Sequence, residues 1–574
     1  YNYTPTEIGV FVVHAAARPE RPAAAARTIH DQLRRVREGG ITADEIDRAR
    51  SLVEAQWLRR MEAADGQANF LGAWELTGRW EDGVDYQQAV LRADAAKLTA
   101  VAKKYLDLDA MAIVAYRPRG TAALGEHAAA VRELLERPGI APLEPSPPPT
   151  LVPAAAPARA TLERTVDGVH VFRTSNGVPI LVRPRPGATL AHVGYFVAGG
   201  VIQESESDGG ISTLMARTML RGTFRRTATQ LAEDAERLGG VPGASVGTES
   251  MQWTMGVPAS RLDGACELLA DLVLNPTFPA DGLEAERAIA IAALASLRDD
   301  MYRQPMRLAA EVAWPEHPYG RSTIGTERSL ASIDETMLRA WHTRTVRSAH
   351  SVLAVVGDVD PQTTADLIAA RFGELHPAPR PAIARPAWPT AAGSKVDQRD
   401  KAQTALTIFF PGPDRADPAR FDAEMLSGVA SGLGGRFFEE LRDRQSLAYT
   451  VMARPYARAV GGTFAAYIAT SPGKEDTARD GLLAEFAKLC REEVTPLELE
   501  RARQYAIGAW QIRQTAGIDV LGDVADAFLW GALEDLARYP EDLAGVTTAS
   551  MRAMAQRWFD PERRVEGIVR GVAS

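Results

Sequence analysis

The stretch Ile41-Thr-Ala-Asp-Glu-Ile-Asp-Arg-Ala-Arg50 returns in related form as Val494-Thr-Pro-Leu-Glu-Leu-Glu-Arg-Ala-Arg503. The two copies lie 453 positions apart (41 to 494), and the same offset carries Gly9-Val-Phe onto Gly462-Thr-Phe. The alignment needs no gap as far as Asp107, which meets Asp560. One fold is therefore used at least twice in this chain of 574 residues.

Local signals divide the first copy into strands and helices. Strands are predicted over 1–20, where residues 10–16 are apolar, and over 111–116, and helical patterns cover 21–39 and 95–105. Another helix begins at Thr42, because a glutamate three residues later completes a capping box. The first copy begins in the middle of the repeat, so we expect an upstream segment or a separate chain to supply the earlier part.

Composition limits the class of protein. A hydrophobic content of 46% and a charged content of 24% are typical of soluble globular proteins. The net charge of −9 argues against nucleic acid as the main partner. No apolar run approaches the roughly 18 residues of a membrane span. Heavy use of Ala and Arg indicates a bacterial genome, and the compartment, periplasm or cytoplasm, stays open.

Two proline-rich stretches divide the chain. Residues 137–164 form a Pro/Ala-rich linker between two lobes, and 377–395 form a second connector. They separate three units, at 1–136, 165–376 and 396–574. Each unit mixes strands and helices with short connections, which predicts repeated α/β sandwiches of the α+β class.

Five motifs resemble, in order and spacing, the pitrilysin/insulinase family of zinc metallopeptidases, which includes mitochondrial processing peptidase. The resemblance implies four homologous domains in two lobes that close like a clam shell around a peptide. This chain would supply the end of the second domain and the whole third and fourth domains. The motifs are Gly210 to Thr223, Leu238-Gly-Gly240, His317-Pro-Tyr-Gly320, Val355-Val-Gly-Asp358 and Gly435 to Tyr449.

The zinc signature of that family is degenerate in this chain. The family places an inverted H-x-x-E-H on a helix, where two histidines hold the metal and the glutamate polarises water. The matching positions here are Thr213, Ala216 and Arg217. The third ligand, a glutamate, should fall within 290–298, which contains no carboxylate. We therefore expect no metal on this chain, and a zinc on the missing N-terminal segment or on a partner chain.

Two residues keep a catalytic pattern. Arg442 and Tyr449 match an Arg/Tyr pair of the family's fourth domain, and the resemblance implies that they face the metal across the chamber. A guanidinium donates to a substrate carbonyl, and a phenol donates to the oxyanion of the tetrahedral intermediate. The alternative is a helix-capping arginine and a half-buried strand tyrosine.

These patterns predict the part of a zinc metalloendopeptidase that binds no metal, inactive by itself and active as a heterodimer or with its upstream segment. Its substrate would be a peptide or an unfolded protein, bound as an added strand. The alternative is a catalytically inactive scaffold or peptide-binding subunit, as in the core subunits of the respiratory cytochrome bc1 complex. An H-x-x-E-H upstream would select the peptidase.

Overall fold

The computed structural model describes residues 2–4, 9–137, 158–432 and 434–572. The chain forms two compact units, described separately below. Unit 1 contains residues 1–149 and 232–240, and unit 2 contains 150–231 and 241–574. Most of the linker predicted at 137–164 lies outside the described residues. The predicted domain bounds and the two-lobed arrangement stay predictions.

Unit 1 is mostly helical, and the predicted helices over 21–39, from Thr42 and over 95–105 are confirmed. The predicted strands are largely wrong: among the described residues of 1–20 only Asn2–Tyr3 and Val10–Phe11 are strands, and 111–116 is irregular. A strand needs a partner for its backbone hydrogen bonds, and here Val114 and Tyr116 are fully exposed. The elements are β1 (Asn2–Tyr3), β2 (Val10–Phe11), α1 (Pro22–Arg37), α2 (Ala43–Glu62), α3 (Ala64–Thr77), α4 (Trp80–Leu91), α5 (Ala95–Tyr105) and α6 (Ala128–Glu136).

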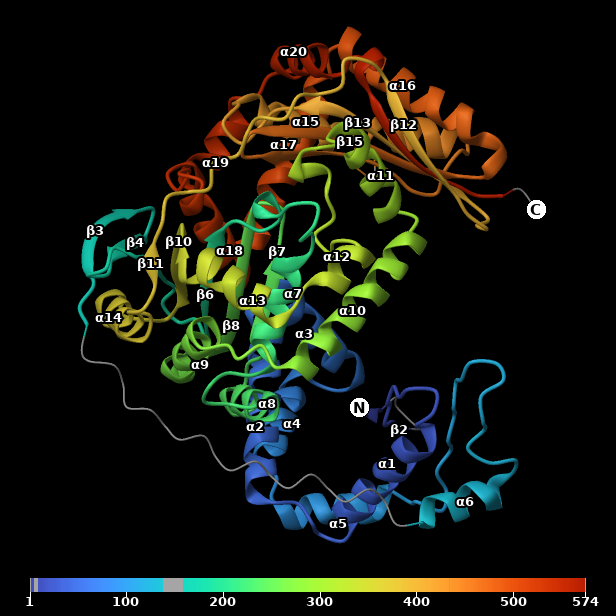
Figure 1. Cartoon of the computed structure of the whole chain (residues 1–574), viewed down its shortest axis with the longest axis vertical. Coiled ribbons are helices and arrows are strands. Elements are labelled where there is room, and N and C mark those ends of the chain that lie inside the picture. The colour runs from blue at the N-terminus through green and yellow to red at the C-terminus, as the bar shows by residue number, and fades with distance from the viewer. Residues whose placement is uncertain (1, 5–8, 138–157, 433, 573–574) are drawn as a thin grey trace. The chain divides into compact units, whose positions relative to one another are not determined.

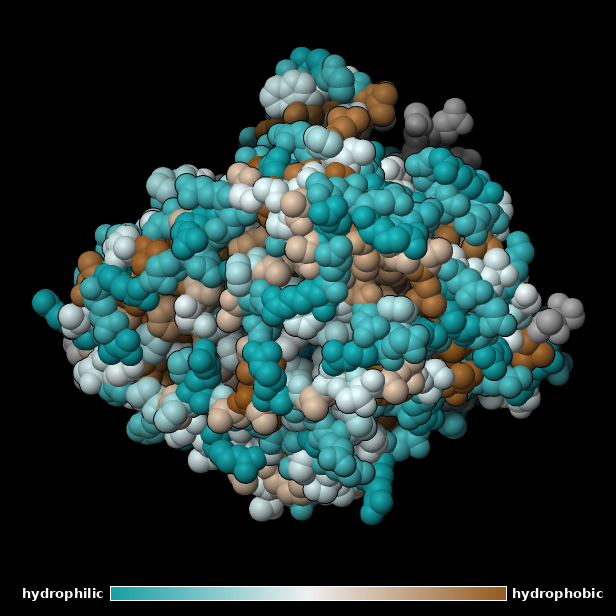
Figure 2. Space-filling model, turned by 90° about the horizontal axis from the view of Figure 1, so that it is seen from above, coloured by the Kyte–Doolittle hydropathy of each residue, from teal (hydrophilic) through white to brown (hydrophobic). Residues whose placement is uncertain are grey.

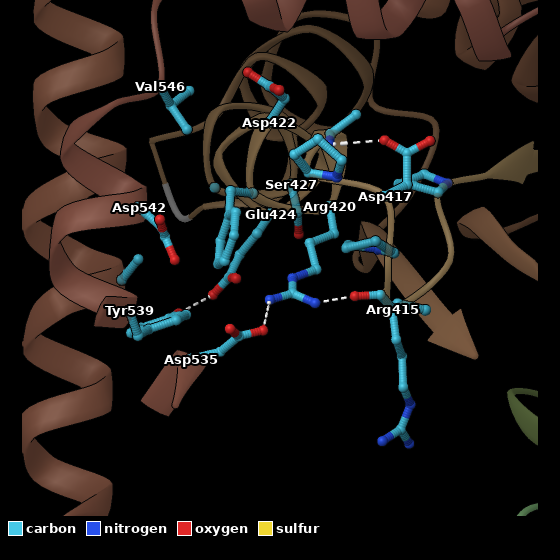
Figure 3. Close-up of a pocket in the computed structure, with 18 of the residues that line it drawn as sticks. Arg415, Asp417, Arg420, Asp422, Glu424, Ser427, Asp535, Tyr539, Asp542 and Val546 are labelled. Atoms are coloured by element: carbon cyan, nitrogen blue, oxygen red, sulfur yellow. Dashed lines mark hydrogen bonds and ion pairs between the residues drawn. The ribbon is translucent and has the colours of Figure 1, made fainter. Parts of the chain in front are cut away.

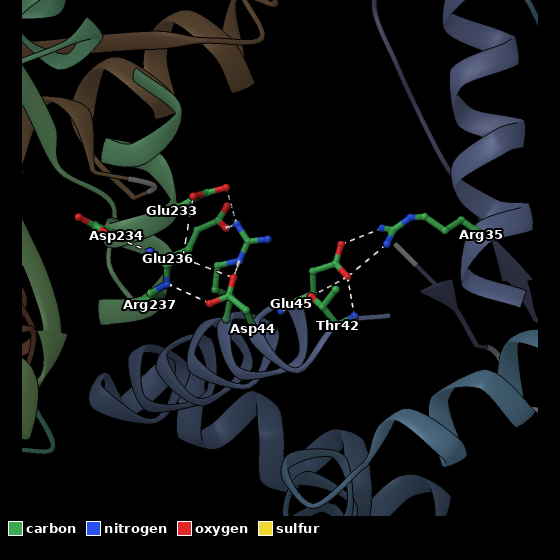
Figure 4. Close-up of polar contacts among 9 residues, drawn as sticks. Arg35, Thr42, Asp44, Glu45, Glu233, Asp234, Glu236 and Arg237 are labelled. Atoms are coloured by element: carbon green, nitrogen blue, oxygen red, sulfur yellow. Dashed lines mark hydrogen bonds and ion pairs between the residues drawn. The ribbon is translucent and has the colours of Figure 1, made fainter. Parts of the chain in front are cut away.

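Polar contacts fix the start of α2 (Figure 4). The predicted capping box is present: the backbone N–H of Glu45 donates to the Thr42 hydroxyl at 3.2 Å, and the Thr42 N–H donates to the Glu45 carboxylate at 2.8 Å. Arg35 adds an ion pair to the same carboxylate at 2.7 Å. Within unit 1, Arg48 of α2 lies 3.4 Å from Glu233 of α8 (Ala228–Leu238). Charge-assisted hydrogen bonds therefore stabilise the N-terminus of α2.

The first sheet of unit 2 has seven strands in the order β3-β4-β5-β10-β6-β8-β7. β5 and β10 run parallel, and the other neighbours are antiparallel. The strands are β3 (Thr161–Val166), β4 (Val169–Arg173), β5 (Pro179–Pro184), β6 (Leu190–Ala198), β7 (Gly243–Val246), β8 (Ser250–Pro258) and β10 (Ser351–Gly357). Its helices include α7 (Ile211–Thr218), α9 (Leu262–Leu274), α10 (Ala280–Asp299), α12 (Glu327–Ser332), α13 (Glu335–His342) and α14 (Pro361–Arg371).

The second sheet repeats five strands of the first. Its order is β12-β16-β13-β15-β14, with β12 parallel to β16 and the rest antiparallel. This is the pattern of β5-β10-β6-β8-β7. The strands are β12 (Gly393–Gln398), β13 (Thr404–Gly412), β14 (Val451–Arg458), β15 (Gly461–Thr470) and β16 (Val565–Arg570). The helices are α15 (Ala419–Ser431), α16 (Glu475–Arg491), α17 (Pro496–Arg513), α19 (Asp535–Ala544) and α20 (Thr548–Trp558).

Each sheet of unit 2 carries one helix that comes from the other half of the unit (Figure 1). Helix α18 (Gly517–Leu529) packs on β10 and β6, where Val520 and Val524 share a core with Val352 and Ala354. Helix α11 (Arg303–Ala313) packs in the same way on β16 and β13. Successive strand residues point to opposite faces, so each exchanged helix covers the sheet face that the sheet's own helices leave open.

The sequence repeat holds in three dimensions. Shifted by 453 positions, the first residues of α1, α2, α3 and α5 coincide with those of α16, α17, α18 and α20. Tertiary hydrogen bonds follow the same shift: Arg50 donates to the carbonyl of Ala93 at 2.7 Å, and Arg503 donates to the carbonyl of Val546 at 2.9 Å. The helices of unit 1 are therefore a second copy of the helices that follow β15 in the chain.

Hydrophilic side chains cover most of the face seen in Figure 2, and hydrophobic ones lie in smaller groups between them. Among the helices of the described residues, none is both long and apolar enough to cross a bilayer.

Candidate functional site

Helix α7 carries the degenerate zinc positions, and a buried carboxylate caps its first turn. The Glu204 carboxylate accepts hydrogen bonds from the backbone N–H of Gly210 at 2.8 Å and of Ser212 at 3.0 Å. Burial raises the pKa of Glu204, although these two bonds act in the opposite direction. An acid before a helix start is a weak signal by itself, and sequence reasoning did not find this cap.

The three degenerate positions do not fit a zinc ion. The Thr213 hydroxyl donates to the carbonyl of Thr323 at 2.6 Å, and Ala216 is buried without a donor atom. Arg217 Nη1 lies 3.8 Å from Glu286 Oε2, so a cation occupies the place of a ligand. Zinc requires thiolate, imidazole or carboxylate ligands. Within the described ranges, no group of three such residues could hold a metal.

An ion-pair cluster links α7 to α10 instead. Glu286 of α10 is buried, and its Oε1 accepts a hydrogen bond from Arg221 Nε at 2.7 Å while Arg217 approaches its other oxygen. A buried carboxylate is tolerated when cations and hydrogen bonds satisfy it. Glu286 precedes the 290–298 window in which a third zinc ligand was expected, and its arginine partners are far away in the sequence. No local pattern therefore pointed to it.

Arg442 and Tyr449 lie next to each other. The Arg442 guanidinium carbon is 4.6 Å from the ring centroid of Phe438 and 5.7 Å from that of Tyr449. A left-handed residue, Ser446 (φ 50°), turns the chain between them, and the buried Leu447 anchors the turn. The Tyr449 side chain is 82% exposed. Arg442 Nε also lies 3.4 Å from Asp443 Oδ1, so the guanidinium has both an aromatic and a carboxylate neighbour.

A pocket of about 2120 Å³ lies elsewhere in unit 2, among α15, α17, α19, α20 and β14 (Figure 3). Its wall carries charged side chains that are paired across helices. Arg420 lies 2.8 Å from Asp535, and the Tyr539 hydroxyl donates to Glu424. Neither Arg442 nor Tyr449 lines this pocket. The structure therefore does not place the Arg/Tyr pair in this pocket.

Two carboxyl groups of α15 in this pocket have raised pKa values. Burial raises the pKa of Glu424 and of Asp422. Each has a hydroxyl partner, Tyr539 for Glu424 and Ser550 for Asp422. Perturbed carboxyls are frequent at active sites and also in structural networks. Because each acid here is bonded to a packed helix, we assign both to the support of the helical layer.

Two family descriptions match the chain almost without a gap between them. Residues 180–327 match the description "Insulinase (Peptidase family M16)", and residues 332–505 match "Peptidase M16 inactive domain". The first match contains the degenerate positions on α7, and the second contains Arg442 and Tyr449.

Individual proteins and solved structures that are similar to this chain carry related descriptions. An uncharacterized zinc protease of Mycobacterium leprae is 27% identical over 340 residues, which cover 58% of this chain and 76% of that protein. The crystal structure of a peptidase M16 inactive domain from Pseudomonas fluorescens has a TM-score of 0.66 at 20% identity, covering 70% of this chain and 98% of that one. A chain of Complex III2 from Candida albicans has a TM-score of 0.61 at 16% identity, covering 70% and 96%.

Proposed function

Since the chain belongs to the insulinase family of peptidases (M16) and is similar to its zinc proteases, we propose that it is the part of a zinc metalloendopeptidase that binds no metal. Its role is to shape the substrate chamber and to hold the peptide. The zinc, its ligands and the catalytic glutamate belong to an upstream segment or to a partner chain, as in a heterodimeric processing peptidase. The substrate is a peptide or an unfolded protein segment.

The observation that carries this proposal is the contact between Arg442 and Tyr449. The Arg442 guanidinium carbon lies 5.7 Å from the ring centroid of Tyr449, and this partly exposed side chain and the exposed phenol would offer two hydrogen-bond donors to one short stretch of backbone. The guanidinium would hold a substrate carbonyl through its fixed fork of N–H groups. The phenol would donate to the oxyanion that forms during hydrolysis. A purely structural role would favour burial of the tyrosine rather than 82% exposure.

The experiment compares Arg442→Ala and Tyr449→Phe with the unaltered protein in the complete assembly, which includes the H-x-x-E-H domain. Each variant should lower kcat/KM for an unstructured fluorogenic peptide by roughly ten-fold or more, as for loss of one oxyanion donor. The matched controls are Arg444→Ala and Tyr505→Phe, which alter another exposed arginine and tyrosine and should leave cleavage unchanged. Unchanged turnover in both test variants would remove the proposed role.

Zinc content gives an independent check. The purified chain alone should contain no stoichiometric zinc by elemental analysis, because the hydroxyl of Thr213 and the charge of Arg217 are both engaged elsewhere. One tightly bound zinc per chain would contradict the assignment of these positions.

The second candidate is an inactive scaffold, and one observation favours it: a chain of Complex III2 has the same fold. The fold therefore cannot decide between the two functions. Peptide cleavage by the complete assembly distinguishes the two functions, because a scaffold lacks an H-x-x-E-H domain and should not cleave the fluorogenic peptide. In that case Arg442→Ala would have no measurable effect.

A further inference from the structure

A further pocket of unit 2, with a volume of about 430 Å³, lies between the end of β5 and the C-terminal end of α17. The wall of this β5–α17 pocket includes Arg183 and Arg185 from the first half of the unit, and Trp510, Gln514 and Asp523 from the second half. Ligand sites in proteins are concave, have volumes of about 300–1,000 Å³ and fix the ligand through a few polar groups. Neither the Arg/Tyr pair nor the degenerate zinc positions line this pocket, so the proposed function gives it no role.

The internal repeat shows which side chain is missing at the β5–α17 pocket. In unit 1, Trp57 packs edge-to-face on the buried Phe70, with ring centroids 4.6 Å apart. The shift of 453 positions carries Trp57 to Trp510 and Phe70 to Asp523. Unit 2 therefore keeps the tryptophan and has a shorter carboxylate where the other copy has an aromatic ring. A pocket lined by both residues takes the place of the aromatic contact.

The two arginines of the pocket have hydrogen-bond donors to spare. Arg185 Nη2 donates to the carbonyl of Thr515 at 3.0 Å, while its Nη1 is buried and has no acceptor among the described residues. Arg183 Nη2 lies 3.8 Å from Asp167 Oδ2, which is longer than a hydrogen bond. A buried donor without an acceptor is unfavourable. An oxygen atom supplied by a ligand would satisfy the guanidinium of Arg185.

The charges at the pocket favour a negatively charged ligand. Asp523 already accepts a hydrogen bond from Arg513, and Asp167 is the nearest carboxylate to Arg183. Within the part of the chain that the structure describes, no carboxylate forms an ion pair with Arg185. Three guanidinium groups therefore stand against two carboxylates. Arginine presents a planar fork of donors that matches the two oxygens of a carboxylate.

The rest of the wall suits the body of a small organic molecule. Trp510 provides an aromatic ring, Val520 is buried, and Leu536 is a partly buried apolar side chain. Within the described residues, the side-chain amides of Gln511 and Gln514 make no hydrogen bond, so they stay available to a polar group of the ligand. The pocket thus combines one cationic end with an aromatic and apolar wall.

We infer that the β5–α17 pocket binds a small organic carboxylate, with the carboxylate group at Arg185 and a flat or apolar body against Trp510. Both halves of unit 2 line the pocket, so the bound acid would connect them. This inference does not depend on the proposed function, because the pocket shares no residue with the Arg/Tyr pair or with the degenerate zinc positions.

Fluorine NMR of the full chain labelled with 5-fluorotryptophan tests the inference at the pocket itself. The chain has 10 tryptophans, and the variant Trp510→Phe identifies the signal of Trp510. Benzoate should shift this signal in a saturable titration with a Kd of about 1 mM or tighter. Benzamide, which has the same shape without the charge, should bind roughly ten-fold or more weakly. An unmoved Trp510 signal with benzoate, or an equal response to benzamide, would overturn the inference. An equal response to inorganic phosphate would show a general anion site and contradict a carboxylate ligand.

Substitutions in the pocket provide the second readout. Arg185→Gln should weaken benzoate binding roughly ten-fold or more, whereas Arg298→Gln, which removes an arginine of another ion pair, should not change it. Arg185→Gln also removes the bond to Thr515, so Gln511→Glu gives a second test at an exposed position. Its added negative charge should weaken the binding of benzoate and leave that of benzamide unchanged. Arg442→Ala should keep benzoate binding in full. If benzoate binds to the Arg185 and Gln511 variants as it does to the unaltered chain, the assignment of the pocket is wrong.

Discussion

At the scale of single residues, ionised carboxylates fix the starts of the repeated helices. Glu498 closes the capping box of α17 and also accepts two hydrogen bonds from Arg436, at 2.7 and 2.9 Å. Glu45 does the same for α2 with Arg35 as its partner. The arginine in each case lowers the pKa of the glutamate to about 2. The capping box is thus repeated, and each glutamate gains an arginine from a non-equivalent position, because the shift of 453 carries Arg35 to Lys488.

The ion pair between Glu498 and Arg436 predicts that the stability of the protein depends on pH. A depressed folded-state pKa adds stability above the unfolded-state pKa of glutamate, near 4.3, and that stability is lost as the pH falls toward the folded-state pKa of about 2. Glu498→Gln should therefore lower the free energy of unfolding by about 1–2 kcal/mol at pH 5, and by roughly half of that at pH 3. Guanidinium titrations at the two pH values measure the difference. Glu500→Gln, which removes an exposed pair with Arg503, is the control and should change stability little at either pH.

Sequence reasoning reached only part of this residue-scale chemistry. The Thr42/Glu45 box was predictable because its partners are three residues apart. The loss of zinc ligands at Thr213 and Arg217 was readable from a motif with fixed spacing. The ion pair of Glu286 was not, because its partners lie 65 and more positions away and only the packing of α7 on α10 brings them together.

At the scale of helices and strands, backbone contact decides where the exchanged helix α11 lies. β16 has a glycine, Gly567, where a Cβ atom would overlap the carbonyl oxygen of Pro305 and the amide of Ala309. The helix axis can therefore approach the strand closely, which buries Ala309 and Ala313 against the second sheet. A side chain at position 567 would push the helix away from the sheet.

Gly567→Ala should accordingly destabilise the protein, by about 1–3 kcal/mol for an overpacked contact. The measurement is the midpoint of thermal or urea unfolding. Gly508→Ala is the matched control, because a Cβ there meets nothing within 4 Å inside α17. That control should stabilise the protein by about 0.5–1 kcal/mol through the higher helix propensity of alanine. Equal effects of the two substitutions would contradict close packing of α11 on β16.

The elements differ in how far the sequence predicts them. Helix α5 carries complete local signals, with Asp94 before its first turn and two lysines in its last turn, and its predicted bounds of 95–105 agree with the structure. The predicted strand at 111–116 is wrong, because a strand forms only where another strand pairs with it. The exchange of α11 and α18 was not predicted either. An apolar helix face shows that the helix is buried, but not which of two similar sheets covers it.

At the scale of the whole molecule, the exchange joins the two halves of unit 2 into one folding unit. Removal of the second half would uncover Val352 and Ala354 of the first sheet, and removal of the first half would uncover Val520 and Val524 of α18. Burial of each such side chain contributes about 1.5–3 kcal/mol, while a domain has a net stability of only about 5–15 kcal/mol. Neither half should retain its fold without the other.

Cutting the chain tests this dependence. Fragments 1–381 and 382–574, expressed separately, should each bind the dye ANS and lack a cooperative unfolding transition, since each exposes a sheet face and the apolar face of its exchanged helix. Co-expressed, they should form a one-to-one complex on size exclusion, with a single transition. Val524→Asp in the second fragment should abolish that complex, because it puts a charge into the contact of α18 with β6 and β10. A monomeric 382–574 that unfolds cooperatively would show that the second sheet is stable without α11, and the exchange would then be a contact between two independent domains.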